Sequence, residues 1–198
     1  MQVTDMKAPA DDLRMSESEK GFVLWFTGLP SSGKTTLARV MADKLKDIGI
    51  KVELLDGDEV RKSLSPDLGF SKKDREIHAQ RVAYLCKLLS RNGIVSIVSL
   101  ISPYRVSRQQ AREHVGNRFV EIWAKCSLET CIERDVKGLY KKAMEGKISD
   151  MTGVQDPYED PVDNEITVDT EHSPVDKCAA KILHYLVERN YLKIPQPI

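Results

Sequence analysis

The sequence predicts an α/β fold in which a parallel sheet has helices on both faces, together with a lid segment. Short apolar segments with strand character alternate along the chain with segments of helical character. This alternation is typical of parallel sheets, because a crossover between parallel strands needs a connection about as long as a helix. A glycine-rich loop between the first strand and the first helix is the second observation, since such loops bind phosphate groups.

Five segments have the composition of buried strands, namely Gly21–Thr27, Lys51–Asp56, Ile94–Ile101, Arg118–Ala124 and Glu165–Asp169. Helical spacing of apolar residues predicts helices from Lys34 onward, over Lys72–Asn92 and over Asp176–Tyr191. In the middle helix the core stripe runs back to His78 and Arg75. The first turns of that helix are therefore expected to direct polar side chains toward whatever the rest of the helix packs against.

The chain has 198 residues, which fits one domain with a sizeable core. Residues 1–20 are polar, contain Pro9 and show no periodicity, which predicts a mobile arm or a linker from a larger protein. The folded domain is expected to span residues 21–192, and residues 193–198 would form a C-terminal tail.

Charge and cysteine content exclude several classes of protein. Thirty basic and thirty acidic residues give a net charge of zero, so nothing drives non-specific binding to nucleic acid or to an anionic membrane. The four cysteines form no C-x-x-C pair, which favours buried free thiols over regulatory disulfides. No apolar run approaches the roughly 18 residues of a membrane span, and the polar N-terminus does not resemble a signal peptide. We therefore expect a cytoplasmic protein without nucleic-acid or membrane partners.

The most specific motif is the run GLPSSGKT, which matches G-x-x-x-x-G-K-[ST] at every constrained position. It lies between the first expected strand and the first expected helix, the order that a phosphate-binding loop (P-loop) requires. Backbone N–H groups of such a loop and the positive end of the helix face the phosphates. Lys34 then neutralises the β- and γ-phosphates, and the Thr35 hydroxyl is offered to Mg²⁺. The sequence therefore predicts a P-loop NTPase-type fold, and a glycine turn without function is the weaker alternative.

A P-loop alone does not separate GTPases, motor ATPases and small-molecule kinases. The chain lacks the N-K-x-D motif of GTPases, and the strand that ends at Ile101 lacks the usual terminal aspartate. Acidic residues instead follow the second strand, in Asp56-Gly57-Asp58. Because the carboxyl ends of parallel strands open onto one crevice, these carboxylates are expected to face the triphosphate. A carboxylate there accepts the proton of an acceptor hydroxyl or helps to hold Mg²⁺, although Asp-Gly-Asp is also an ordinary turn sequence.

The segment Val136–Pro161 breaks the alternation of strands and helices. It is rich in lysine, is punctuated by glycine and has little apolar periodicity. Connections of this length in compact domains are usually functional lids or disordered segments. A lid is favoured here, because lysines near a triphosphate can close over it and exclude water. A solvated basic loop is the alternative.

Several separated motifs resemble one known family. They are the P-loop with Thr36, LLDGDEVRKSLSPDLGFSKKDRE (Leu54–Glu76), ISPYR (Ile101–Arg105), ERDVKGLYKKA (Glu133–Ala143) and TGVQDPYEDP (Thr152–Pro161). In this order they resemble the adenylyl-sulfate kinases (APS kinases) of sulfate assimilation, over essentially all of residues 21–190. The resemblance implies transfer of the γ-phosphoryl group of MgATP to the 3′-hydroxyl of adenylyl sulfate, with 3′-phosphoadenylyl sulfate and ADP as products.

The resemblance also implies roles for residues around the donor. The ATP-binding residues would be Gly28, Ser31, Ser32, Gly33, Lys34, Thr35, Thr36, Arg134 and Ser173. Arg134 and the loop Thr170–Pro174, which contains Ser173, would border the adenine. The catalytic residues would be Asp58, Lys34 and Ser102, with Asp58 as the catalytic aspartate. Ser102 occupies the position of a phosphoserine intermediate, a role that direct in-line transfer does not need. Thr35 and Asp58 would hold Mg²⁺.

The acceptor pocket implied by the resemblance is gathered from several segments. Arg61 and Arg75 would hold the phosphosulfate, because a guanidinium binds such anions in bidentate geometry. Phe70 would stack on the purine. The expected substrate-binding residues are Asp56, Gly57, Asp58, Arg61, Phe70, Arg75, His78, Ile101, Ser102, Lys137, Leu139, Met151 and Thr152, with Lys137 and Leu139 in the closing lid.

The chain departs from the family pattern at His78, Gln80 and Met151. His78 stands where the family commonly has a substrate-contacting Asn, and Gln80 stands where it has an Arg. A structural histidine is the alternative for His78. Met151 replaces the Phe that usually precedes Thr152 and forms half of an aromatic clamp opposite Phe70. Methionine can still cover a base through its polarizable sulfur.

Two alternatives to this function stay open. One is a kinase of the same fold for another nucleotide-linked acceptor, and the other is a catalytically silent nucleotide-binding partner domain in a sulfate-activating assembly. Arg61, Phe70 and Arg75 argue against an acceptor without a base. Because the family is typically dimeric, the resemblance implies a homodimer, and the N-terminal arm leaves open a fusion or association with an ATP sulfurylase.

Overall fold

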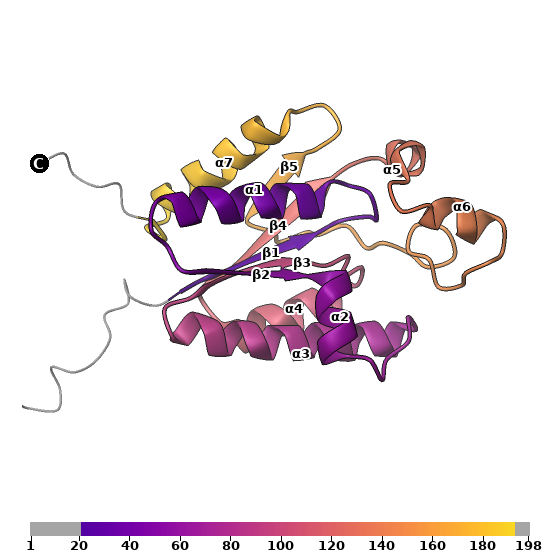
Figure 1. Ribbon diagram of the computed structural model, residues 1–198, viewed down its shortest axis with the longest axis horizontal. Helices are drawn as coiled ribbons and strands as arrows, with labels where there is room; N and C mark the ends of the chain where they lie inside the picture. Colours follow the sequence, from indigo (N-terminus) through magenta and orange to yellow (C-terminus); the bar gives the residue numbers. More distant parts are fainter. Residues whose placement is uncertain (1–20, 193–198) are drawn as a thin grey trace, which may run out of the picture.

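The computed structural model describes residues 21–192, and the arm expected at 1–20 and the tail expected at 193–198 lie outside the described residues. Its centre is a five-stranded sheet with the strand order β2-β3-β1-β4-β5 (Figure 1). The strands are β1 (Val23–Thr27), β2 (Val52–Asp56), β3 (Val95–Ser99), β4 (Phe119–Lys125) and β5 (Ile166–Asp169). Every pairing between them is parallel, so the predicted fold class is confirmed.

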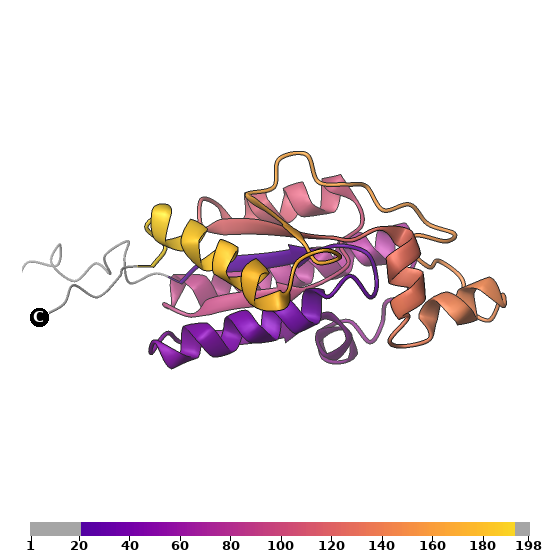
Figure 2. The same cartoon turned by 90° about the horizontal axis from the view of Figure 1, so that it is seen from above.

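Helices cover both faces of this sheet (Figures 1 and 2). They are α1 (Lys34–Asp47), α2 (Gly57–Leu64), α3 (Lys72–Arg91), α4 (Arg105–Val115), α5 (Leu128–Arg134), α6 (Leu139–Met144) and α7 (Val175–Glu188). Helices α1 and α7 pack on one face, whereas α3 and α4 pack on the other. Helices α5 and α6 extend beyond the carboxyl edge of the sheet. Within residues 21–192, no helix is long and apolar enough to cross a membrane.

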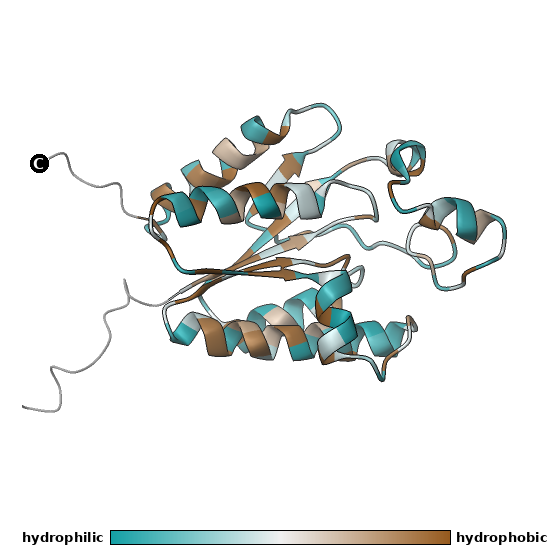
Figure 3. Cartoon of the chain, viewed as in Figure 1, coloured by the Kyte–Doolittle hydropathy of each residue, from teal (hydrophilic) through white to brown (hydrophobic). Residues whose placement is uncertain are grey.

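The sequence of β1 explains why both faces are covered. Leu24 and Phe26 belong to the core formed with α1 and α7, whereas Val23 and Trp25 belong to the core formed with α3 and α4. Because successive side chains of a strand alternate between faces, a strand that is apolar throughout needs cover on both sides. Figure 3 shows the same division, with apolar residues on the strands and on the helix surfaces turned toward them.

The strand order creates a crevice at the carboxyl edge of the sheet. From β1 the chain moves outward to β2, returns to β3 beside β1, and then crosses to β4 and β5 on the other side of β1. In such sheets ligands bind where the direction of winding reverses, outside the carboxyl ends of the strands. The loops that follow β1, β2 and β3 therefore border one crevice.

Two predicted elements end two or three residues earlier in the structure than expected. Strand β3 ends at Ser99, before the expected Ile101, and the chain reaches a backbone φ of 36° at Ser102. A strand cannot continue through such a conformation, so the residues after Ser99 form a loop at the crevice. Helix α7 ends at Glu188, although its apolar stripe predicted a helix as far as Tyr191.

The segment Val136–Pro161 is more ordered than its sequence suggests. It contains α6, whose Tyr140 and Ala143 are buried. These two side chains pack with Cys131 and Met151 in a small cluster of their own. The segment thus carries an apolar core, which short apolar runs without helical periodicity did not reveal.

Candidate active site

One large cavity, with a volume of about 460 Å³, lies at the carboxyl edge of the sheet. Small-molecule sites typically measure roughly 300–1,000 Å³. Its wall brings together most of the expected site residues, namely Ser31, Gly33, Lys34, Thr35, Thr36, Asp56, Gly57, Asp58, Arg61, Phe70, Arg75, His78, Ile101, Ser102, Arg134, Lys137, Leu139 and Ser173. Residues expected at the donor and residues expected at the acceptor therefore share one space.

The P-loop owes its shape to residues with a positive φ, which is 149° at Gly28, 62° at Ser31 and 85° at Gly33. A Cβ atom at Gly28 would lie 2.7 Å from the carbonyl oxygen of Ala124, so a side chain does not fit there. Gly28 and Ser32 are absent from the cavity wall, and Ser32 is fully buried. These two expected ATP-binding residues therefore shape the P-loop without lining the cavity.

Lys34 supplies the cation of the P-loop. The residue is 7% exposed, and Nζ donates a hydrogen bond of 2.5 Å to the carbonyl oxygen of Leu29. Burial is the main cause that lowers the pKa of Lys34 to about 8. A triphosphate beside the ammonium favours the charged form of Lys34, so binding of the anion raises the pKa of this lysine.

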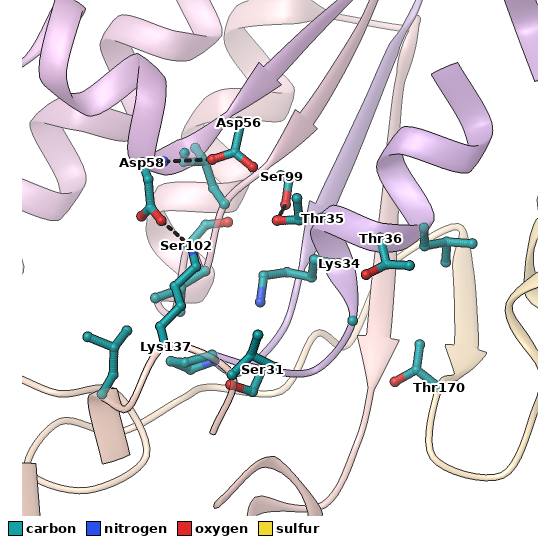
Figure 4. A pocket seen from close by; sticks show the side chains of 18 of the residues that line it. Ser31, Lys34, Thr35, Thr36, Asp56, Asp58, Ser99, Ser102, Lys137 and Thr170 are labelled. Carbon is teal, nitrogen blue, oxygen red and sulfur yellow. Dashed lines mark hydrogen bonds and ion pairs between the residues drawn. The ribbon is translucent and has the colours of Figure 1, made fainter. Parts of the chain in front are cut away.

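Three oxygen-bearing side chains gather where β2 and β3 end (Figure 4). Thr35 Oγ1 and Ser99 Oγ lie 3.0 Å apart, and Asp56 is the register partner of Ser99. The Asp56 carboxylate also caps α2 by accepting a hydrogen bond of 3.1 Å from the backbone N–H of Asp58. A Cβ atom at Gly57 would lie 2.8 Å from the carbonyl oxygen of Ser99, which explains the glycine between the two aspartates.

Asp58 forms an ion pair with Lys137, which reaches it from the lid segment (Figure 4). The two residues are 79 positions apart in the sequence. The Lys137 and Asp58 side chains are 57% and 69% exposed, so water screens the pair and a ligand can exchange with either partner. The turn Asp56-Gly57-Asp58, which we call the acidic turn, and the lid segment therefore meet at the cavity.

Phe70 has two guanidinium groups close to its ring. The Cζ atoms of Arg61 and Arg75 are 4.7 and 5.5 Å from the centre of its ring. Arg75 Nη2 also donates a hydrogen bond of 2.5 Å to the carbonyl oxygen of Asp150 in the lid segment. Burial lowers the pKa of both arginines, which stay cationic near neutral pH. An exposed ring close to two cations suits a flat aromatic ligand that carries an anion.

His78 is a neutral, buried imidazole on the cavity wall. Its Nδ1 atom is 2.9 Å from Ser65 Oγ, and the residue is 4% exposed. Burial, followed by the charges of Arg61 and Arg81, lowers its pKa to about 4. Its Nε2 atom is buried without a hydrogen-bond partner among the described residues. The contact with Ser65 is the kind expected if His78 is a structural histidine. The Nε2 atom keeps an unused hydrogen-bonding position for a ligand.

Ser102 is held in place by the core. Its Oγ atom accepts a hydrogen bond of 3.0 Å from Trp25 Nε1, and the residue is 8% exposed. The φ of 36° is unusual for a residue with a side chain. The hydroxyl thus stabilises the loop that forms this part of the cavity wall.

Met151 and Thr152 are absent from the cavity wall. Met151 is 6% exposed and packs in the cluster with Cys131 and Tyr140, while Thr152 is fully buried. We expected Met151 opposite Phe70 on the purine, and this structure places its side chain in the apolar cluster of the lid segment instead. An apolar side chain is stabilised by joining such a cluster, which the sequence pattern did not reveal.

The sequence analysis did not single out Ser99, a polar residue of the cavity wall, whereas Thr170, also on the wall, begins the loop expected beside the adenine. Thr170 Oγ1 donates a hydrogen bond of 2.8 Å to the carbonyl oxygen of Ser32 and so ties the loop after β5 to the P-loop. Arg134 Nη2 donates to the carbonyl oxygen of Thr170 at 2.9 Å. Ser99 is the last residue of β3, and its place at the carboxyl end of a strand is the signal that would have found it.

Comparison with known proteins identifies the family. The family model described as adenylylsulphate kinase matches residues 20–169. An adenylyl-sulfate kinase of Halothermothrix orenii is 45% identical to this chain over 181 residues, which cover 91% of the chain and 97% of the relative. The chain belongs to the adenylylsulfate kinase family. The family expected from the sequence is thus confirmed.

A solved structure of a relative agrees with the fold. The Mycobacterium tuberculosis APS kinase in complex with AMPPNP and APS is 36% identical and superposes with a TM-score of 0.81, covering 84% of this chain and 98% of that one. Some relatives are larger. A probable bifunctional SAT/APS kinase of Sorangium cellulosum is 45% identical over 87% of this chain, which spans 29% of that protein.

Proposed function

We propose that this adenylylsulfate kinase transfers the γ-phosphoryl group of MgATP to the 3′-hydroxyl of adenylyl sulfate, releasing 3′-phosphoadenylyl sulfate and ADP. The observation that carries the proposal is the shared cavity, whose wall contains residues of the P-loop, the turn Asp56-Gly57-Asp58, and Phe70 with the two arginines close to its ring. Family membership supports this acceptor over the two alternatives raised by the sequence.

The donor half binds and polarises the triphosphate. Backbone N–H groups between Gly28 and Thr36 surround the β-phosphate, and the N-terminus of α1 adds its positive potential. The Lys34 ammonium neutralises charge on the β- and γ-phosphates as the transferring group separates from ADP. Arg134 and Ser173 line the far end of the cavity, where we place the adenine.

The acceptor half orients the hydroxyl. Arg61 and Arg75 bind the phosphosulfate, the exposed ring of Phe70 stacks on the purine, and His78 offers its free Nε2. The Asp58 carboxylate accepts the proton of the 3′-hydroxyl as that oxygen bonds to the γ-phosphorus. The bond from the γ-phosphorus to the bridging oxygen of ADP breaks in the same displacement.

The side chains at this edge fit a magnesium ion, which would neutralise charge on the β- and γ-phosphate oxygens. Mg²⁺ prefers oxygen ligands and usually keeps several waters, with few ligands from the protein. Thr35 Oγ1 and the Asp58 carboxylate would hold it, and Ser99 Oγ orients the Thr35 hydroxyl. Residues 21–192 contain no cluster of three or more His, Cys, Asp or Glu side chains suited to a metal, which fits an ion held mainly by nucleotide and water.

We assign Ser102 to positioning, although the resemblance gives it the place of a phosphoserine intermediate. Its hydroxyl accepts a hydrogen bond from Trp25 and is almost fully buried, so an attack on the γ-phosphorus would require the loop to leave its packed position. Direct transfer between two nucleotides in one cavity needs no covalent step.

Closure of the lid segment, a homodimer and a cytoplasmic location are further parts of the proposal. The contacts of Lys137 with Asp58 and of Asp150 with Arg75 support closure, because they join the lid segment to the acceptor residues. The homodimer, and any fusion to an ATP sulfurylase, rest on the family resemblance. Light scattering of the purified chain tests the dimer, and a monomer at assay concentration would contradict it.

The test of the proposed function is a coupled assay of ADP release with adenylyl sulfate and MgATP. We expect ADP release to depend on adenylyl sulfate and the product to carry a new 3′-phosphate by mass spectrometry. AMP, shikimate and gluconate serve as control acceptors. Turnover of one of these at an equal or higher kcat/KM, or no turnover of adenylyl sulfate by folded protein, would contradict the proposal.

A further inference from the structure

The cavity wall includes a short loop, Ile101–Pro103, that we call the acceptor loop. Its centre is Ser102, whose backbone φ of 36° is costly for a residue with a side chain. Such a conformation persists only where surrounding contacts enforce it. Trp25 and Thr27 on β1 supply some of these contacts, and one buried cation on α4, Arg108, supplies another that also reaches the lid segment.

Arg108 is 2% exposed, which is rare for an arginine and requires each of its polar groups to be paired. Its Nε atom lies 2.8 Å from Glu121 Oε1 on β4. Nη1 donates a hydrogen bond of 2.7 Å to the carbonyl oxygen of Ser102. Nη2 donates a hydrogen bond of the same length, 2.7 Å, to the carbonyl oxygen of Glu159. One planar guanidinium therefore joins the sheet, the acceptor loop and the end of the lid segment.

The end of the lid segment, Tyr158–Asp160, which we call the lid base, is fastened to the acceptor loop by further bonds. The backbone N–H of Glu159 donates to the carbonyl oxygen of Pro103 at 2.8 Å. The Glu159 carboxylate accepts a hydrogen bond of 2.7 Å from the backbone N–H of Arg105. Tyr158 Oη lies 2.9 Å from Thr27 Oγ1, at the end of β1. The lid base and the acceptor loop thus form one tied unit.

The charge of Arg108 is balanced within the same cluster. Glu121 is buried, and burial is the main cause that raises its pKa, whereas Arg108 and Arg112 lower it. Arg112 also pairs with Glu165 on the side of the cluster away from the acceptor loop. Arg112 contacts neither the acceptor loop nor the lid base in the described hydrogen bonds, so it provides a matched control for Arg108.

We propose that Arg108 is a positioning residue that fixes the acceptor loop and the lid base in one geometry, so that the acceptor pocket is shaped before the substrate arrives. This inference rests on the proposed function, because it concerns how that acceptor is held. Arg108 touches neither the cavity nor the P-loop. Its effect is therefore on the acceptor, and the ATP site keeps its own contacts.

The first experiment compares Arg108→Lys with Arg112→Gln in steady-state kinetics. Lysine keeps the charge, but its three donors share one nitrogen and cannot reproduce the planar, spread-out donor positions of the guanidinium. Arg108→Lys is expected to raise the KM for adenylyl sulfate by about tenfold or more and to change the KM for ATP by less than about twofold. Arg112→Gln is expected to lower the melting temperature while leaving both KM values within about threefold of wild type. Equal changes in both KM values, or the same pattern in the two variants, would overturn the inference.

The second experiment needs no activity and separates this inference from the proposed function. Hydrogen exchange of the ligand-free protein is measured at the acceptor loop and at the lid base. Arg108→Lys is expected to speed exchange in both segments together, because one guanidinium ties both, and Arg112→Gln is expected to leave them as in wild type. Unchanged exchange in Arg108→Lys, or faster exchange in only one segment, would overturn the inference even if the kinase assay succeeds. Faster exchange in both segments would support it even if adenylyl sulfate is not the acceptor.

Discussion

The phosphate-binding part of the donor half comes from one continuous stretch, Gly28–Thr36, whereas the acceptor half is gathered from separated stretches between Asp56 and Leu139. The cation of the donor half, Lys34, is 7% exposed, whereas the ring of Phe70 in the acceptor half is 54% exposed. A contiguous loop is shaped by its own glycines and the helix that follows. A pocket gathered from distant segments depends on contacts such as those of Arg108 and Arg75. We therefore expect substitutions in the two halves to separate ATP binding from acceptor binding.

The largest effect is expected from Lys34→Ala. The variant removes the cation that stabilises charge on the γ-phosphoryl group in the transition state, and transfer is expected to fall by about a thousandfold. The measurement is kcat in the coupled ADP assay, with circular dichroism to verify folding. Activity within about tenfold of wild type would refute the assigned donor site.

Asp58→Asn tests the acceptor half, because it should lower turnover while ATP still binds. Loss of a general base is expected to reduce kcat by at least about a hundredfold. The matched control is Asp67→Asn, which removes an exposed carboxylate paired with Arg81 outside the cavity wall. If Asp58→Asn weakens ATP binding as strongly as it lowers kcat, Asp58 is mainly a magnesium ligand.

The pKa of Lys34 predicts a pH dependence confined to the donor half. Because burial lowers this pKa to about 8 in the free protein, a rising pH deprotonates Lys34, and ATP binding must then take up a proton. The affinity for ATP is therefore full below that pH and falls above it by up to about tenfold per pH unit. Titration calorimetry from about pH 7 to 9 measures the slope. Lys34→Arg keeps its charge and should remove the slope, so an equal slope in both proteins would contradict the assignment.

The smallest effect on the acceptor is expected from Met151→Phe. The larger ring must enter the cluster with Tyr140 and Ala143, and overpacking is expected to cost about 1–3 kcal/mol of stability. Adenylyl sulfate binding should not tighten, because the side chain does not line the cavity. Met151→Leu, nearly equal in volume, serves as the control. Tighter binding with an unchanged melting temperature would restore the view that residue 151 covers the purine.

The same contrast explains what the sequence predicted and what it did not. The P-loop and the aspartates at the end of β2 were predictable, because a contiguous motif and the parallel-sheet rule fix their places. The contacts that hold the residues of the acceptor half in place were not predictable. Ser65 and His78 are 13 residues apart, and Trp25 and Ser102 are 77 apart, so no periodicity links them.

The place of Met151 shows a second limit of the sequence analysis. The resemblance to the family gave position 151 a role on the purine, but the packing of α6 decides where the side chain lies. The sequence does not reveal the buried charged cluster either. The residues around Arg108 have the pattern of an exposed polar helix. Only the fold shows that this residue faces Glu121 and two carbonyl oxygens.

The central claim is that one cavity holds two nucleotides at separate places, with the acceptor at Phe70. The most direct measurement is calorimetry of adenylyl sulfate and of a non-hydrolysable ATP analogue binding to wild type, to Phe70→Ala and to Tyr84→Ala, an exposed aromatic control on α3 outside the cavity wall. Loss of stacking is expected to weaken adenylyl sulfate binding in Phe70→Ala by about 1–3 kcal/mol, with the ATP analogue unchanged and the control like wild type. Weaker binding of the ATP analogue with unchanged binding of adenylyl sulfate would contradict the account, because Phe70 would then serve the donor base.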